Sequence, residues 1–188
     1  ISADECIACG VCVDTCPCDV LELGDDSSGR ISVTYAPHAV YSVAEPILRA
    51  VAEDSARTGR VIHIHASETA REVEECVGAH GMSPVAYLDS LGVLGPRTVL
   101  AHAVHLSDED IDIIRERKSW ISHCPCSNFK LASGQFRYHK AVELGGCRFT
   151  LGTDGCASNN NLSMLEEMKF AALSAKNESG EPTAGRDG

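Results

Sequence analysis

Five side chains that can bind a metal ion or move a proton stand at the ends of five short stretches that we predict to be β-strands. They are His38 after ISVTYAP, His65 in VIHIH, His102 in TVLAH, His123 in SWISH and Asp154 in FTLGTD. Neutral imidazole and carboxylate groups suit a divalent metal that keeps one position open for water. One histidine at a strand end is usually a packing or surface residue, but five such groups at successive strand ends predict a shared site.

The elements that must position these groups alternate between strand and helix. Extended runs at residues 31–35, 61–66, 98–104, 119–125 and 148–154 are separated by helical patterns at 42–59, 69–81, 106–118 and 136–146. Such alternation predicts an α/β fold with a parallel sheet and crossover helices, either doubly wound or part of a (β/α) barrel. In a barrel the carboxyl ends of the strands carry the catalytic groups, so we expect the five side chains to gather there.

Local signals mark several helix ends. The pairs Ser42–Glu45 and Ser107–Asp110 predict capping boxes at two helix starts, and Gly59 predicts the end of the first helix. Ile47 and Leu48 belong to an apolar stripe at helical spacing, which predicts a face that packs on the sheet. The polar tail from residue 177 to residue 188 is expected to be disordered.

A second group of possible ligands stands near the N-terminus. Cys6, Cys9, Cys12 and Cys16, followed by Pro17, have the spacing Cys-x2-Cys-x2-Cys-x3-Cys-Pro. Residues 1–26 therefore resemble a bacterial-type ferredoxin, which implies a 4Fe-4S cluster on these thiolates. In two-cluster ferredoxins the fourth cysteine binds the other cluster, so a distant thiol such as Cys18 or Cys76 is an alternative to Cys16. A zinc site or a set of buried thiols is the other interpretation.

Charge and composition exclude several classes of protein. The net charge is -11, and the first 29 residues hold seven acidic residues and no lysine or arginine. Nucleic-acid binding is not expected, because neutralising phosphates requires clustered basic residues. The sequence contains no apolar run of the roughly 18 to 20 residues that a membrane span needs, so no membrane partner and a cytoplasmic location are expected. The polar stretch at 24–30 predicts a linker between domains at 1–29 and 30–188.

Four longer motifs carry a family resemblance that covers residues 30–176. They are IHIHASETAREVEE, LAHAVHLSDEDI, ISHCPCSNFKLASG and LGTDGCASNNNLSMLEEMKFAAL. These motifs resemble the amidohydrolase superfamily, and within it the methylthioadenosine and S-adenosylhomocysteine deaminases and the related chlorohydrolases. The resemblance implies a partial (β/α)8 TIM-type barrel made of the equivalents of strands four to eight.

The same resemblance implies a site and a reaction. His65 and Asp154 would bind zinc or iron, and Glu68 would shuttle protons and contact the substrate. His102 would polarise the attacking water and Asp154 would assist in deprotonating it, while His38 and His123 would contact the substrate. The implied reaction is hydrolytic deamination of a small adenosine-type amine, in which activated water attacks the carbon that bears the amino group.

The sequence also departs from the family pattern. The His-x-His pair of the first barrel strand has no counterpart, because His63 and His65 belong to the strand that leads to Glu68. His63 is expected to be an interior packing group or a partner of a ligand. Five strands cannot close an eight-stranded barrel, so we expect a fragment with a bare sheet edge, or pairing with a second copy or a complementing chain. An iron-sulfur electron-transfer module on a non-catalytic scaffold is the alternative function.

Overall fold

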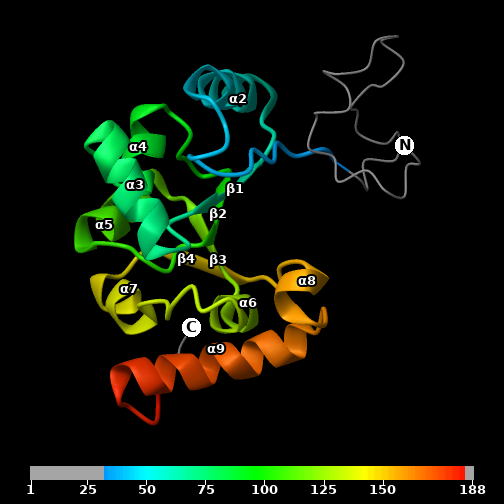
Figure 1. The fold of residues 1–188 in the computed structure, drawn as a ribbon, viewed down its shortest axis with the longest axis vertical. Helices are drawn as coiled ribbons and strands as arrows, with labels where there is room; N and C mark the ends of the chain where they lie inside the picture. Colours follow the sequence, from blue (N-terminus) through cyan, green and yellow to red (C-terminus); the bar gives the residue numbers. More distant parts are fainter. Residues whose placement is uncertain (1–31, 185–188) are drawn as a thin grey trace.

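The computed structural model describes residues 32–184, and the predicted alternation of strands and helices is its framework (Figure 1). The strands are β1 (Ile62–Ala66), β2 (Thr98–His102), β3 (Trp120–His123) and β4 (Arg148–Leu151). The longer helices are α2 (Glu45–Thr58), α3 (Ala70–His80), α5 (Asp108–Arg117) and α9 (Met164–Ser179). Shorter ones are α4 (Pro84–Ser90), α6 (Pro125–Lys130), α7 (Tyr138–Leu144) and α8 (Cys156–Asn159). The predicted iron-sulfur segment lies outside the described residues.

All four strands are parallel and lie in the order β1-β2-β3-β4. The first predicted strand, at residues 31–35, is not a regular strand in the part that the structure describes. From residue 32 to residue 39, only isolated parallel bridges join Tyr35 to Ile62 and Ala39 to His65. This segment still runs beside β1, so four strands and one irregular extended segment follow the predicted order. Within the described residues β4 is one edge strand of the sheet.

The two faces of the sheet differ in burial. Ile62, Leu100 and Ile121 point to one face and are no more than 2% exposed, because helices pack over them. On the other face, Trp120 is 37% exposed and His63 is exposed as well. Parallel sheets in complete domains are usually covered on both faces. The uncovered face agrees with the partial barrel that the sequence predicted.

Helix ends follow the predicted signals in two cases out of three. Gly59 ends α2 in the left-handed conformation, with φ of 77°. Ser107 and Asp110 form the predicted capping box of α5. The capping box at Ser42 was wrong: α2 begins after Ala44 without a side-chain cap, because the Ser42 hydroxyl bonds the His38 ring and the Ala39 carbonyl instead.

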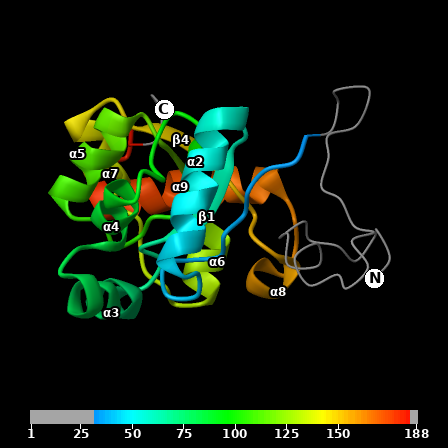
Figure 2. The same cartoon turned by 90° about the horizontal axis from the view of Figure 1, so that it is seen from above.

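Other expectations need correction. Leu48 is fully buried as predicted, but Ile47, from the same stripe, is 55% exposed. The tail was expected to be disordered from residue 177, whereas α9 continues to Ser179 and ends at Gly180. Helix α9 runs along α6 and α7 and reaches β4, so tertiary contacts stabilise its last turns (Figure 1, Figure 2). None of the described helices is long and apolar enough to cross a membrane.

Candidate metal centre

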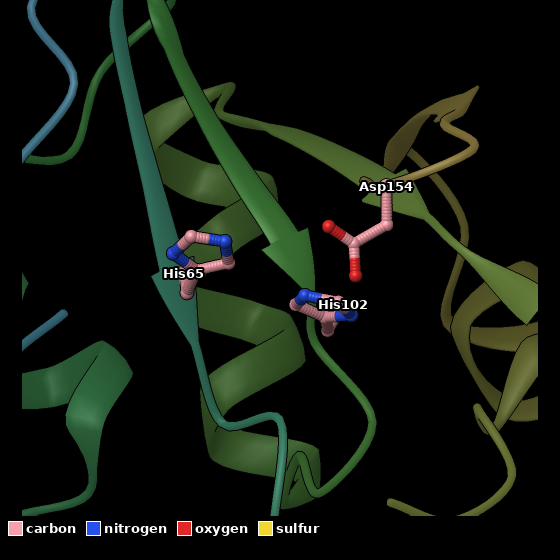
Figure 3. A group of neighbouring side chains, drawn as sticks. All are labelled: His65, His102 and Asp154. Carbon is pink, nitrogen blue, oxygen red and sulfur yellow. The ribbon is translucent and has the colours of Figure 1, made fainter. Parts of the chain in front are cut away.

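Three of the five predicted side chains meet at the carboxyl edge of the sheet. His65 lies near the end of β1, His102 is the last residue of β2, and Asp154 follows β4 (Figure 3). One potential ligand atom from each lies within 4.8 Å of the other two. The rings of His65 and His102 stack with their centroids 5.3 Å apart. The parallel strands therefore gather two imidazoles and one carboxylate from segments up to 89 positions apart (154 − 65).

The backbone turns sharply where these groups leave the sheet. His102 has φ of 71° and Asp154 has φ of 59°, which is the left-handed region that residues with a Cβ rarely adopt. Ser67, two residues after His65, has φ of 53°. Each such conformation costs about 1–3 kcal/mol and persists only where the surrounding structure fixes it. These turns direct the side chains at the ends of β1, β2 and β4 toward one another.

Hydrogen bonds fix the orientation of both imidazole rings. Nδ1 of His65 lies 2.8 Å from the His38 carbonyl oxygen, which can only accept, so Nδ1 carries the hydrogen and Nε2 keeps a free lone pair. Nδ1 of His102 donates in the same way to Oδ1 of Asn128, also at 2.8 Å. Such bonds to the far ring nitrogen are typical of metal-binding histidines. Two imidazole nitrogens and a carboxylate form a donor set that fits a divalent metal.

Asp154 is held as an acceptor on both oxygens. The Ser127 hydroxyl donates to Oδ2 at 2.6 Å, and the Gly155 N–H donates to Oδ1 at 2.7 Å. Burial raises the pKa of Asp154, but these two hydrogen bonds and the nearby His102 outweigh it and lower the pKa overall. The carboxylate form is therefore the favoured one.

Glu68 faces the same cluster. Its Oε2 lies 3.8 Å from Nε2 of His102, too far for a hydrogen bond but a spacing that a water molecule can bridge. The Ser133 hydroxyl donates to the other oxygen at 3.0 Å. Buried Glu72 accepts from the backbone N–H groups of Ser67 and Glu68 at 3.0 and 2.8 Å, which fixes the turn that presents Glu68.

His38 lies beside the cluster, and His123 is set apart from it. The exposed His38 ring is 5.0 Å from the His65 ring and bonds Ser42 at 2.7 Å. His123 is 5% exposed and packs 5.0 Å from Phe136, on a cavity of about 320 Å³ between β4 and α9. Burial, with a smaller effect of His102, lowers the pKa of His123 to about 4. Within the described residues Nδ1 of His123 has no hydrogen-bond partner.

Sequence reasoning missed the side chains that orient these groups. Three polar residues in the stretch SNFKLAS each form a hydrogen bond to a different side chain of the site. Ser127 bonds Asp154, Asn128 bonds His102 and Ser133 bonds Glu68. In the structure these three polar side chains are only 0–6% exposed, which marks them as unusual. The sequence gives no such signal, because burial depends on the tertiary structure. The pattern Thr69-x-x-Glu72 is a capping-box signature and could have drawn attention to Glu72.

Comparison with known proteins agrees with this geometry. The chain is 49% identical over 155 residues to a 5'-deoxyadenosine deaminase of Methanothermobacter thermautotrophicus, covering 82% of this chain and 36% of the relative. It is 44% identical over 165 residues to a 5-methylthioadenosine/S-adenosylhomocysteine deaminase of Pelotomaculum thermopropionicum. This match covers 88% of this chain and 38% of the relative. The chain thus spans little more than a third of these curated relatives.

A solved structure has the same arrangement of elements. An adenosine deaminase from Xanthomonas campestris with bound zinc superposes with a TM-score of 0.78 at 38% identity, over 82% of this chain and 35% of that one. The sequence model of the Amidohydrolase family matches residues 20–186, which begins before the predicted boundary at Gly29 and leaves Cys6 to Cys16 outside the match. The match covers most of the chain, and the chain belongs to the amidohydrolase family.

Proposed function

We propose that this chain carries part of the active site of a metal-dependent aminohydrolase, which removes the amino group of adenosine-type compounds. The observation that carries the proposal is the meeting of His65, His102 and Asp154 at one edge of the sheet, with Glu68 beside them. Relatives named for deamination of 5'-deoxyadenosine and of methylthioadenosine or S-adenosylhomocysteine support this substrate class. The zinc of the Xanthomonas structure supports zinc as the metal.

Each residue has a separate role in the proposed reaction. His65 and Asp154 hold the cation, which supplies Lewis-acid activation of water when it is bound. His102 presents a free Nε2 lone pair and orients the attacking water. Glu68 takes one proton from that water and passes it to the ring nitrogen. It then passes the second proton, from the newly added hydroxyl group, to the amino group, which leaves as ammonia; its Oε2 lies 3.8 Å from Nε2 of His102, beside this water. Exposed His38, next to His65, contacts the nucleoside portion of the substrate.

His123 takes part only indirectly in this proposal. Its burial beside Phe136 sets it behind the cluster, so it shapes the wall of the site while the other five residues face the metal and the substrate. Further metal ligands come from polypeptide beyond the described residues, in keeping with the uncovered sheet face and the free edge of β4. A second copy or a complementing chain is the partner that would supply them.

Metal content and ammonia release test the proposal together. We expect the full chain to bind about one zinc ion in addition to any metal on the N-terminal cysteines, and His65→Ala and Asp154→Asn to lose that ion. Glu68→Gln and His102→Ala should keep the ion, because neither residue is assigned as a ligand, and should lose ammonia release from 5'-deoxyadenosine by at least ~100-fold. Binding of zinc that is the same in Asp154→Asn as in the wild type would overturn the metal site. Zinc loss in His102→Ala would instead make His102 a ligand.

The cysteine spacing supports a second function. We propose that Cys6, Cys9, Cys12 and Cys16 hold a 4Fe-4S cluster that transfers electrons. Anaerobic reconstitution should give bound iron and sulfide in the wild type and in Cys156→Ser, a change of an exposed thiol, but not in Cys9→Ser. Equal iron in all three proteins would refute the cluster, and loss of zinc along with iron in Cys9→Ser would mean that the two sites are one.

A further inference from the structure

One fully buried carboxylate has no part in the reaction proposed above. Glu167 lies on α9 and is 0% exposed. It accepts hydrogen bonds from the backbone N–H of Cys126 at 3.2 Å and from Nδ2 of Asn159 at 2.6 Å, and the Cys126 thiol also bonds to it. Removing a carboxyl group from water costs several kcal/mol when it is ionised, and the cost is offset only where the partners are well placed. The position of these partners indicates what the carboxylate does.

Both residues that donate to Glu167 are connected to Asp154 through one further contact. Nδ2 of Asn159 also donates to the carbonyl oxygen of Thr153 at 2.6 Å, so the two amide hydrogens tie Thr153 to Glu167. On the other side, Cys126 directly precedes Ser127, whose hydroxyl holds Oδ2 of Asp154 at 2.6 Å. The Glu167 carboxylate therefore fixes the backbone just before Asp154. It also fixes helix α6, which carries the Ser127 hydroxyl that bonds the Asp154 side chain.

Asp154 needs such support because of its backbone. Its φ of 59° is a left-handed conformation, which is unfavourable for a residue with a Cβ unless neighbouring contacts fix it. The segment from Thr153 to Asn159 leaves the edge strand of the sheet, and β4 has a neighbour on one side only among the described strands. Contacts from α6 and α9 are thus what hold the loop in place.

We propose that Glu167 is a positioning residue, which holds the Asp154 loop in the conformation that binds the metal. This inference rests on the proposed function, since it assigns Asp154 as a ligand. Loss of either hydrogen bond frees one side of the loop, and the carboxylate of Asp154 then spends less time facing His65 and His102. Metal affinity should fall, although Glu167 itself touches no metal ligand.

Titration of the full chain with cobalt(II) tests this proposal, because the visible spectrum of cobalt reports the geometry of its ligands. Glu167→Gln keeps the size of the side chain, but its amide group faces either the Cys126 N–H or the Asn159 amide with a donor of its own. One of the two hydrogen bonds is therefore lost. We expect cobalt affinity to fall by about 10- to 100-fold, the usual effect of losing a residue that orients a ligand, with a changed visible spectrum. Glu166→Gln is the matched control, since Glu166 lies on the same helix as Glu167 but accepts from Asn161, which precedes the helix.

A double variant separates positioning from general stability. Combining Glu167→Gln with Asn159→Asp lets the new amide donate to the new carboxylate, but leaves the Thr153 carbonyl without its donor. We expect cobalt affinity to stay low in the double variant. Measured well below the melting temperature of each protein, wild-type affinity in Glu167→Gln or full recovery in the double variant would overturn the proposal.

Asp154→Asn distinguishes this inference from the proposed function. The variant keeps every cysteine, so subtracting its titration removes cobalt bound to thiolates. If Asp154→Asn binds cobalt as well as the wild type does, the metal assignment fails, and the inference fails with it. If it loses cobalt while Glu167→Gln does not, only the role of Glu167 is wrong.

Discussion

Buried His123 makes the stability of this protein dependent on pH. The ring is 5% exposed and packs against Phe136, and burial together with the nearby His102 lowers its pKa to about 4. In the unfolded chain an ordinary histidine has a pKa of about 6.5. Below that pH the unfolded chain binds a proton that the folded chain does not, so the contribution is fully present above pH ~6.5 and is lost as the pH falls towards 4.

The size of the effect follows from the two pKa values. A tenfold difference in proton affinity is worth about 1.4 kcal/mol, so a pKa of about 4 against about 6.5 corresponds to about 3 kcal/mol in total. At pH 5 roughly 2 kcal/mol of this has been lost. His123→Phe removes the titrating group, and the adjacent cavity of about 320 Å³ with its aromatic lining can accept the new ring.

Urea unfolding of the metal-free chain between pH 7.5 and pH 5 measures this contribution. We expect the free energy of unfolding of the wild type to fall by about 2 kcal/mol more than that of His123→Phe over this range. His80→Phe, at the exposed end of α3, is the matched control and should keep the wild-type dependence. Parallel pH profiles for wild type and His123→Phe would refute the argument, as would an NMR titration that finds His123 protonated near pH 6.5.

Three further predictions follow from single contacts. Leu100→Ala should lower the free energy of unfolding by about 2–5 kcal/mol in a urea titration, because Leu100 is fully buried in the core; a loss below ~1 kcal/mol would contradict that core. Ser107→Ala removes the capping box with Asp110 and should cost about 1 kcal/mol in the same assay, and no loss would mean that α5 does not depend on its cap. Ser133→Ala should reduce ammonia release while zinc content stays unchanged, because its hydroxyl holds Glu68 at 3.0 Å; equal rates would show that Glu68 is oriented without it.

Much of the framework could be predicted because it depends on local pattern. The alternation of extended and helical runs placed the four strands and helices α2, α3, α5 and α7, but not α4 or α6. Gly59 and Ser107 marked two helix ends through their own backbone and side-chain chemistry. The sequence also predicted that groups at the strand ends would share a site, because parallel strands bring their carboxyl ends to one edge, and His65, His102 and Asp154 do meet there. These features need only knowledge of residues near in sequence and of one topological rule.

The remaining features depend on contacts between distant segments. Ser42 resembles a helix cap, but the tertiary structure brings the His38 ring within 2.7 Å and the hydroxyl bonds there instead. Helix α9 continues past residue 177, where disorder was expected to begin, because it packs along α6, α7 and β4. Burial lowers the pKa of His123, and the packing of α9 brings Glu167 to donors 41 and 8 positions away in the sequence. The sequence alone determined which chemical groups stand at the strand ends, whereas only the packing of the chain decided which of them meet and what holds them, because burial and hydrogen-bond partners are properties of segments that touch in space.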